Sequence, residues 1–549
     1  MESQPTYDYV IIGSGFGGSV SAMRLAEKGY SVLVLERGKR YNDQDFAESN
    51  WAFWKYLYNP VLRSFGIFQM SLLNGMLILH GSGVGGGSLG YSNVLMKPED
   101  KLFNAPAWKD LADWKTTLAP HYETAQNMLG VTTNPMLTDI DEHLRQIAVE
   151  LDVEETFAPT EVGVLFGETG EEGQEKPDPY FGGQGPSRMA CQYCGGCMVG
   201  CRYNAKNTLP KNYLYFAEKW GVKVQAEAQV EDIRPLDAEQ DDQARYEISY
   251  FNPTKLLTKP RRQVRARNVI VAAGVLGTLK LLFHCREVTG SLSELSPRLG
   301  NMVRTNSEAL TGATAYHNGK DYSNGIAISS IFQADEVTRI EPVRYPAKSG
   351  LIRLLAWPLI NSEQPAIKRL GQLFYRMITR PRDIFASLVK PRWAERTTIL
   401  LIMQTEDNMV NVRYGRNSWT LFRRGLVFEK GDKETIPTKI EIGHTITKML
   451  AKIMKGAPVG SIAETLLDMP TTAHIMGGCP IGRSPEEGVI DLDFQVFNYP
   501  GLYVVDGSVM PANPGINPSL TITALAEYAM SRVPTKPGHT TPPSPLGLN

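Results

Sequence analysis

The beginning of the chain holds the pattern that most restricts how it can fold. An apolar run over residues 7–12 leads into a G-x-G-x-x-G motif formed by Gly13, Gly15 and Gly18, then into a helical pattern and a second apolar run that ends at Glu36. In such a unit the first glycine permits the turn, the second lets the backbone approach a pyrophosphate, and the third lets helix and strand pack closely. The helix start offers N–H donors to phosphates, and Glu36 is placed to accept from ribose hydroxyls. We therefore predict a Rossmann-like dinucleotide-binding unit.

This motif alone does not separate FAD from NAD, although Glu36 disfavours the 2′-phosphate of NADP. A second glycine-rich segment begins after His80 and runs to Asn93, where an apolar strand-like run follows. Glycine costs conformational entropy in regular structure, so this many glycines indicate backbone lying against a flat ligand, which favours flavin. A flexible linker is the alternative. The residues of this segment that we expect at the cofactor are Gly83, Gly85, Gly86, Ser88 and Asn93.

The charge balance and the apolar runs of the chain limit which partners and which cellular locations we expect. The chain has 57 Lys and Arg against 58 Asp and Glu, which argues against a nucleic-acid partner because neutralising phosphates needs a basic surplus. The first apolar run stops at Gly13 and is too short for a signal peptide. No stretch approaches the roughly 20 apolar residues of a membrane-spanning helix. These features predict a cytoplasmic protein.

Two C-terminal segments complete a set of motifs. Residues 474–479 read HIMGGC and residues 515–524 read GINPSLTITA, with an apolar run and Asp506 between them. Together with the glycine-rich segments they resemble the glucose–methanol–choline (GMC) oxidoreductases, and within that family the cholesterol-oxidase branch. The resemblance runs from residue 7 to about residue 531. It implies FAD-dependent oxidation of the hydroxyl of a hydrophobic alcohol, in its sharpest form a 3β-hydroxysterol going to its ketone, by hydride transfer to flavin N5.

The resemblance also implies an α/β fold with two parts. The first is a Rossmann-like FAD-binding domain built from discontinuous segments, residues 1–100, 211–310 and 465–535. The second is a substrate-binding domain with an antiparallel sheet covered by helices, residues 101–210 and 311–464. The end of the chain, residues 536–549, is rich in proline and is predicted to be a disordered tail.

Further cofactor contacts come from separate segments. Residues 268–277 again read as a buried strand, a glycine turn and a helix, which brings backbone to the cofactor without reference to any family. By resemblance, Val230 belongs to the strand that clasps the adenine, and Asp506 lies near the ribityl and pyrophosphate groups. The residues predicted to contact FAD outside the second glycine segment are Gly13, Gly15, Phe16, Gly18, Glu36, Val230, Ala273, Gly274, Asp506, Gly507 and Pro518.

His474 and Asn517 match the paired active-site residues of the family. The resemblance implies that His474 positions or deprotonates the substrate hydroxyl, as a tuned base must, and that Asn517 donates a hydrogen bond to the substrate oxygen or toward the flavin. A satisfied core histidine and an ordinary turn asparagine are the alternatives. The branch also uses a glutamate base, for which Glu341 is the best match. An ion pair with a flanking arginine is the structural alternative for Glu341, and Glu308 is a rival carboxylate.

Four of the six cysteines have ferredoxin-like spacing within residues 191–201. Thiolates at this spacing can converge on an iron–sulfur cluster, either [4Fe–4S] or [3Fe–4S]. The predicted metal ligands are Cys191, Cys194, Cys197 and Cys201. Tetrahedral zinc and free thiols packed in a turn are the alternatives. A cluster would favour a dehydrogenase that passes electrons to a redox partner, rather than an oxidase that reduces oxygen.

Residues 367–389 read as a helix with Leu370, Leu373, Phe374 and Met377 on one side and basic residues interspersed. Such a helix either packs its apolar face on the core, which we favour, or makes a peripheral contact with an anionic membrane. A fold resemblance does not identify the substrate. The competing functions are a long-chain alcohol dehydrogenase that uses an iron–sulfur cluster, a non-redox flavin enzyme, and a non-catalytic redox or lipid-binding flavoprotein.

Overall fold

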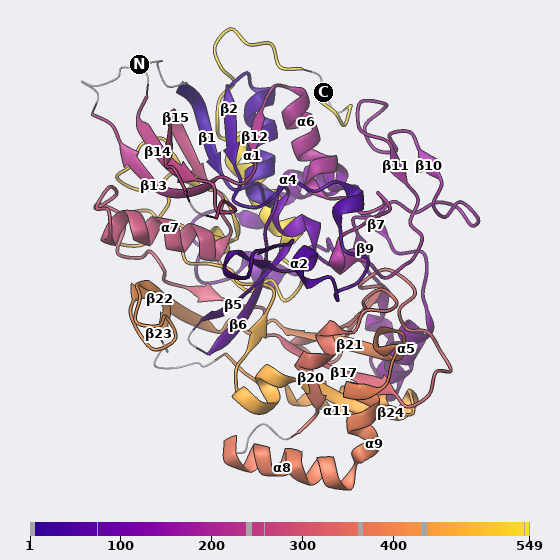
Figure 1. Cartoon of the computed structure of the whole chain (residues 1–549). Coiled ribbons are helices and arrows are strands. Elements are labelled where there is room, and N and C mark those ends of the chain that lie inside the picture. The colour runs from indigo at the N-terminus through magenta and orange to yellow at the C-terminus, as the bar shows by residue number, and fades with distance from the viewer. Residues whose placement is uncertain are drawn as a thin grey trace.

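Two seven-stranded sheets organise the chain, one above the other in Figure 1. The structure is a computed structural model that describes residues 6–73, 75–237, 244–256, 258–360, 366–429, 436–542 and 544–547. The upper sheet is mainly parallel and the lower sheet is antiparallel. The predicted α/β class is therefore confirmed. Residues 1–5, which belong to the segment examined for a signal peptide, lie outside the described part.

The upper sheet is built around β1 (Thr6–Ile12), which lies between β2 (Val32–Leu35) and β15 (Arg262–Val271). Ile12 pairs with Leu35 on one side and with Val271 on the other. Parallel strands covered on both faces need continuous apolar sequence rather than alternation, and the strands around the first glycine motif have it. The sheet is completed by β12 (Lys223–Gln225), β26 (Leu502–Val504), β13 (Gln229–Pro235) and β14 (Tyr246–Phe251).

Three helices, α1 (Phe16–Glu27), α4 (Trp114–Leu129) and α12 (Ser519–Ser531), pack against one another beside this sheet. Trp114 and Leu118 are buried, and the Tyr122 hydroxyl donates to Thr521 Oγ1 of α12 at 2.9 Å. The sequence prediction assigns residues 101–210 to the substrate-binding domain. The structure differs at α4, because the apolar stripe of this helix is buried in the core of the upper sheet.

The lower sheet has all neighbouring strands antiparallel, and α5 (Asp139–Glu150) and α11 (Glu441–Ile453) cover one face. Along β21 (Thr397–Gln404) the side chains alternate: Leu400 and Ile402 pack under the helices, whereas Ile399 and Leu401 line a cavity on the other face. The remaining strands, in spatial order across the sheet, are β20 (Ala356–Pro358), β24 (Gly456–Ser461), β17 (Ala309–Ala315), and beyond β21, β19 (Thr338–Val343), β18 (Ser330–Gln333) and β8 (Ala158–Pro159).

A hairpin of β5 (Phe68–Leu73) and β6 (Met76–Gly81) lies at the junction of the two sheets and pairs with β25 (Thr471–Thr472). Near the C-terminus, the Lys536 ammonium pairs with Asp8 at 2.6 Å and His539 packs on Gly29. The predicted tail therefore begins with residues that contact the body through charge and ring packing, and its disorder beyond them stays a prediction. Further helices and strands of the chain are α2 (Phe53–Tyr56), α7 (Val275–Glu287), α8 (Ala366–Thr379), α9 (Pro381–Ile384), α10 (Trp393–Arg396), β22 (Met409–Gly415) and β23 (Gly425–Glu429).

Candidate active site

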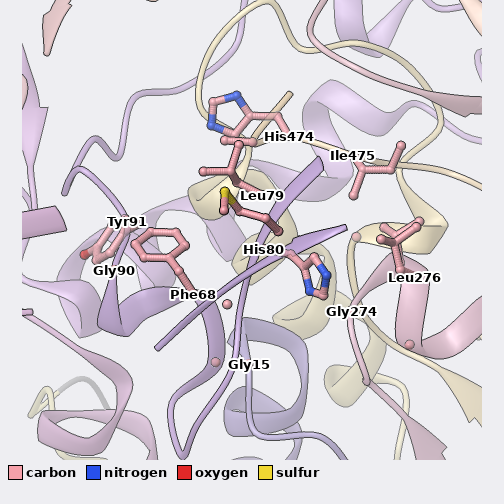
Figure 2. A pocket seen from close by; sticks show the side chains of 18 of the residues that line it. Gly15, Phe68, Leu79, His80, Gly90, Tyr91, Gly274, Leu276, His474 and Ile475 are labelled. Atoms are coloured by element: carbon pink, nitrogen blue, oxygen red, sulfur yellow. The ribbon is translucent and has the colours of Figure 1, made fainter. Parts of the chain in front are cut away.

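A cavity of about 660 Å³ lies between the glycine turns of the upper sheet and the inner face of the lower sheet. Figure 2 shows Gly15, at the start of α1, on one side of this cavity and His474 with Leu79 on another. The structure thus gathers turns that are hundreds of residues apart in the sequence around one space. The predicted FAD residues that line it are Gly13, Gly15, Phe16, Glu36, Gly86, Val230, Ala273, Gly274, Asp506, Gly507 and Pro518.

The start of α1 fits a phosphate group. Its N-cap is Gly15, no side chain caps the first turn, and a Cβ added to Gly15 would meet no atom within 4 Å. Uncapped N–H groups at a helix start are donors for an anion. Two residues further on, the space is closed, because a Cβ at Gly17 would lie 1.8 Å from the Val505 carbonyl oxygen. The open space is therefore confined to the side of α1 where the pyrophosphate of FAD would lie.

Glu36 holds the first turn in shape. Its carboxylate accepts from the Ser14 hydroxyl at 2.7 Å, from the Ser14 N–H at 3.1 Å and from the Gly38 N–H at 2.8 Å, while the residue also lines the cavity. A carboxylate has about four acceptor directions. The Gly83 N–H also donates to Glu36, at 3.4 Å, as the fourth and longest of these contacts. The group braces the backbone, and the ribose hydroxyl that the sequence predicts here would take the place of this weakest bond.

Asp506 ties a second turn to the cavity. Its Oδ2 accepts from the Gly274 N–H at 2.9 Å and from the Thr278 hydroxyl at 2.6 Å, and its Oδ1 accepts from the Ser508 N–H at 2.8 Å. These bonds fix the start of α7 beside the turn that follows β26. A Cβ at Gly274 would meet open space, as at Gly15. The residues present therefore fit FAD, which the starts of α1 and α7 would hold.

Five predicted cofactor residues do not line the cavity. Gly18 lets α1 lie against β1, since a Cβ there would be 2.2 Å from the Gly13 carbonyl oxygen. Gly85 donates its N–H to Ser14 Oγ at 3.1 Å and accepts from the Ser88 hydroxyl at 2.7 Å. These contacts shape the second glycine segment from behind. The five are Gly18, Gly83, Gly85, Ser88 and Asn93.

His474 lines the cavity and is held by the carboxylate of Glu308, which lines the same cavity. Its Nδ1 forms a very short hydrogen bond with Glu308 Oε1, and Glu308 Oε2 accepts from the Ala473 N–H at 2.9 Å. Burial alone would lower the pKa of His474, but the Glu308 charge and hydrogen bond outweigh burial and raise it above the usual value. Because Nδ1 is occupied, the Nε2 atom is the one left for a ligand.

Asn517 lines the cavity in the loop that enters α12. Its side-chain oxygen is buried and has no hydrogen-bond partner among the described residues. Asn306 supports this loop, since its Nδ2 donates to the Ile516 carbonyl at 2.8 Å and also lies 3.2 Å from His474 Nδ1. The sequence did not single out Asn306 for this role, and only its closeness to Glu308 along the chain pointed to it.

Glu341 lies on the inner face of β19 but not in the wall of the cavity. It is fully buried, and within the described structure neither carboxylate oxygen has a hydrogen-bond partner. Burial raises its pKa to about 8, although the nearby charges of His474 and Arg339 act in the opposite direction. The alternative of a local ion pair is not formed, because Arg339 pairs with Glu99 and Arg344 lies 3.6 Å from Asp141.

The rest of the cavity wall is mainly apolar, and the sequence analysis did not name these residues. The continuous apolar run of residues 399–403 was the one available signal, because such a run is typical of a strand with two covered faces. The apolar residues of the lower sheet and its neighbours that line the cavity are Leu310, Val343, Ile399, Leu401 and Val459, and those of the hairpin are Phe68, Met70, Leu77 and Leu79.

The four clustered cysteines do not form the predicted metal site. Across the described residues, no three His, Cys, Asp or Glu side chains are grouped to hold a metal. Instead, the Lys206 ammonium donates to the carbonyls of Leu89, Tyr91 and Cys197 at 2.7–3.1 Å. The loop therefore braces the second glycine segment, and the geometry does not support the cluster.

Comparisons with known proteins identify the family and the fold. A family model described as GMC oxidoreductase matches residues 443–526, and one described as an NAD(P)-binding Rossmann-like domain matches residues 11–41. A pyridoxine 4-oxidase from Mesorbium loti has a similar fold, with a TM-score of 0.57 at 14% identity, over 96% of this chain and 99% of that one.

Two relatives are similar along almost their whole length. A cholesterol oxidase from Acinetobacter baumannii is 45% identical over 532 residues, which cover 96% of this chain and 95% of the relative. A cholesterol oxidase from Mycobacterium tuberculosis (strain CDC 1551 / Oshkosh) is 42% identical over 540 residues, or 97% and 92% of the two chains. This protein therefore belongs to the GMC oxidoreductase family, within its cholesterol-oxidase branch.

Proposed function

We propose that this protein oxidises the hydroxyl group of a sterol-like alcohol, a 3β-hydroxysterol above all, to the ketone with FAD. The observation that carries the proposal is the single cavity in which His474 and Asn517 meet apolar walls and the glycine turns of the upper sheet. Apolar walls with a few convergent polar groups are typical of a site for a greasy molecule with one reacting oxygen. The cholesterol oxidases at 45% and 42% identity support the same substrate class.

The chain's own residues handle the proton and the substrate oxygen. Bound FAD supplies the acceptor for the hydride that leaves the carbinol carbon. His474, held at Nδ1 by Glu308, accepts the hydroxyl proton at Nε2, and Asn517 donates a hydrogen bond to the same oxygen. The apolar side chains of β21 hold the carbon skeleton in place and exclude water.

Glu341 is a second proton-accepting group in this proposal. With a pKa of about 8, it titrates near neutral pH, where a general base is most effective. Since it lies behind the cavity wall, we assign the hydroxyl proton to His474, and the charge of Glu341 acts on that ring. The predicted division into an FAD-binding and a substrate-binding domain is part of the same proposal.

An anaerobic titration tests the function. When holoenzyme is mixed with detergent-dispersed cholesterol in the absence of oxygen, the absorption of the oxidised flavin should disappear on the time scale of turnover. His474→Ala should keep its FAD but bleach at least about 10²-fold more slowly. If cholesterol leaves the flavin oxidised while a long-chain primary alcohol bleaches it, the enzyme is a long-chain alcohol oxidoreductase instead. Arabidopsis thaliana long-chain-alcohol oxidases at 22–23% identity make this the second candidate.

The same sample also identifies the electron acceptor. We propose oxygen, because the cysteine loop does not fit a cluster that would pass single electrons onward. Admitting air to the bleached enzyme should restore oxidised flavin and release one peroxide for each ketone. A flavin that stays reduced in air until an artificial acceptor is added would assign the protein to the dehydrogenases.

A further inference from the structure

The apolar side of α8 faces outward, contrary to the sequence-based expectation. Leu373 is buried, but Leu370, Phe374, Met377 and Ile378 are 48%, 65%, 43% and 78% exposed. Figure 1 shows α8 at the lower edge of the molecule, with no element beyond it. A helix that packs its stripe on the core would cover these side chains. The strongly amphipathic sequence therefore has an apolar face that is not used by the fold.

Neighbouring elements extend this face. Phe385 and Val389, in the short helix η8 (Phe385–Val389), and Leu354, in η7 (Leu351–Leu355), are each more than half exposed. Trp51, which is 44% exposed, lies beside η7, because the Arg353 guanidinium of η7 stacks on its ring at 5.5 Å. Large exposed apolar patches are uncommon on monomers and mark interaction surfaces. We call the exposed apolar residues of α8, η7 and η8 together the α8 face.

The charge of this segment is opposite to that of an anionic lipid surface. Residues 366–392 contain seven Lys and Arg and one acidic residue, Asp383, in a chain whose net charge is −1. Asp383 is buried and accepts from the Tyr316 hydroxyl. Lys368 and Arg380 are exposed and have no ion-pair partner in the described parts of the chain. Exposed cations of this kind are attracted to the negative surface potential of anionic lipid.

The α8 face is adjacent to the cavity. In η7, Ile352 and Leu355 line the cavity whereas Leu354, between them, is exposed. The π-helical turn η8 packs against η7 and against β20. A thin layer of chain therefore separates the outer apolar surface from the inner one. None of the described helices has the length and hydropathy to cross a bilayer, so any lipid contact of this face is with the bilayer surface.

We propose that the α8 face docks on the surface of an anionic phospholipid bilayer, with Phe374 and Ile378 in the acyl boundary and Lys368 and Arg380 at the headgroups. A helix with a large apolar face and basic flanks is suited to this position. Delivery of a membrane-dissolved alcohol through η7 rests on the function proposed above. Binding to the lipid surface does not, and can be measured without any sterol.

Vesicle flotation tests the docking. FAD-loaded protein is mixed with sterol-free vesicles of phosphatidylcholine alone, or of phosphatidylcholine with phosphatidylglycerol. The native protein should float with the anionic vesicles and much less with the neutral ones, and added salt should weaken the binding. The double variant Phe374→Glu/Ile378→Glu should bind at least about tenfold less, because two apolar side chains leave the lipid.

Val149→Glu is the matched control, since Val149 is a 52% exposed apolar residue on α5, away from the α8 face. It should float like the native protein. The double variant should still bleach with detergent-dispersed cholesterol but turn over vesicle-borne cholesterol more slowly. Unchanged flotation of the double variant would overturn the docking proposal. So would a native dimer in sedimentation that the double variant abolishes without any vesicle binding, which would assign the face to a second copy.

Absence of turnover with every alcohol, while flotation behaves as expected, would count against the proposed function and leave the docking intact. Binding to neutral and anionic vesicles alike would remove the role of Lys368 and Arg380 and overturn the choice of an anionic surface.

Discussion

The pairing of Glu308 with His474 is the contact that most changes how the site would work. A histidine facing an apolar cavity loses proton affinity by burial, yet this ring gains it because a buried carboxylate holds Nδ1. The carboxylate also selects the tautomer with Nε2 unprotonated, as a base toward a hydroxyl requires. Glu341 is the other carboxylate whose charge acts on this ring. Glu308 is therefore a positioning residue, acting through His474.

The pH profile of Glu308→Gln checks this role. The neutral imidazole is the form that accepts a proton, so native kcat/KM should fall as the pH drops through the raised pKa of His474. Removing the Glu308 charge lowers that pKa, so the acid limb should move to lower pH by about one unit or more. Because the amide holds the ring less well, kcat should fall on the order of 10²-fold.

Glu464→Gln is a matched control, because Glu464 makes a similar buried contact with His444 Nε2 at 2.5 Å, outside the cavity wall. Its acid limb should coincide with that of the native enzyme. An unshifted limb in Glu308→Gln, with only a loss of stability, would mean that the carboxylate is purely structural.

Among the elements, the first turn of α1 carries two functions within three residues. Gly15 faces open space, whereas Gly17 faces the carbonyl of Val505 at the end of β26. One glycine is thus required by what binds there, and the other by how closely α1 packs on the turn after β26. The G-x-G-x-x-G motif includes Gly15, but Gly17 stands at one of its variable positions, so the motif does not report the close packing at Gly17.

Alanine at each position separates these requirements. Gly15→Ala should fold, with the thermal midpoint of the apoprotein unchanged, but bind FAD at least about tenfold more weakly because the methyl group occupies the approach to the phosphates. Gly17→Ala should lose stability, by about 1–3 kcal/mol or more, through overpacking. Thermal melts of apoprotein and the flavin content after dialysis are the measurements. Equal flavin content in Gly15→Ala and native protein would exclude a phosphate at the start of α1.

At the scale of the whole molecule, the cofactor cavity lies where the two sheets meet. Its walls come from the first glycine turn, from the hairpin of β5 and β6, from the lower sheet and from the loop before α12. A ligand that touches all of them links the two sheets as well as reacting between them. Folding and cofactor binding should therefore be strongly coupled.

Removal of FAD measures that coupling. Free FAD at about 100 times its Kd should add about 2.7 kcal/mol to the free energy of unfolding of the apoprotein, seen as a rise in Tm on reconstitution. FMN, which lacks the adenylate that would reach Glu36 and Val230, should raise Tm less at the same concentration. Identical melts with and without FAD would mean that the cavity between the sheets is not the flavin site.

Much of the upper sheet and of the site could be predicted, because the signals are local. The strand, turn, helix and acidic residue from Tyr7 to Glu36 lie within one short segment. The two apolar runs of this segment can be buried completely only as strands that are covered on both faces. His474 and Asn517 could be named because they stand within distinctive short motifs. Their convergence on the glycine turns depends on how the two sheets and the hairpin meet around the cavity.

Contacts between segments that are distant in the sequence could not be predicted from such local signals. A pattern with period 3.6 reports that residues 367–379 have an apolar face, but not whether anything covers it, since burial depends on the shape of all the other elements. The same limit applies to the hydrogen-bond partner of His474, which lies 166 residues away in the sequence, and to the packing of α4 against α12. It also applies to the cysteines, because their spacing allows a cluster that their packing does not form. Local chemistry sets which groups are available, and three-dimensional packing selects which of them meet.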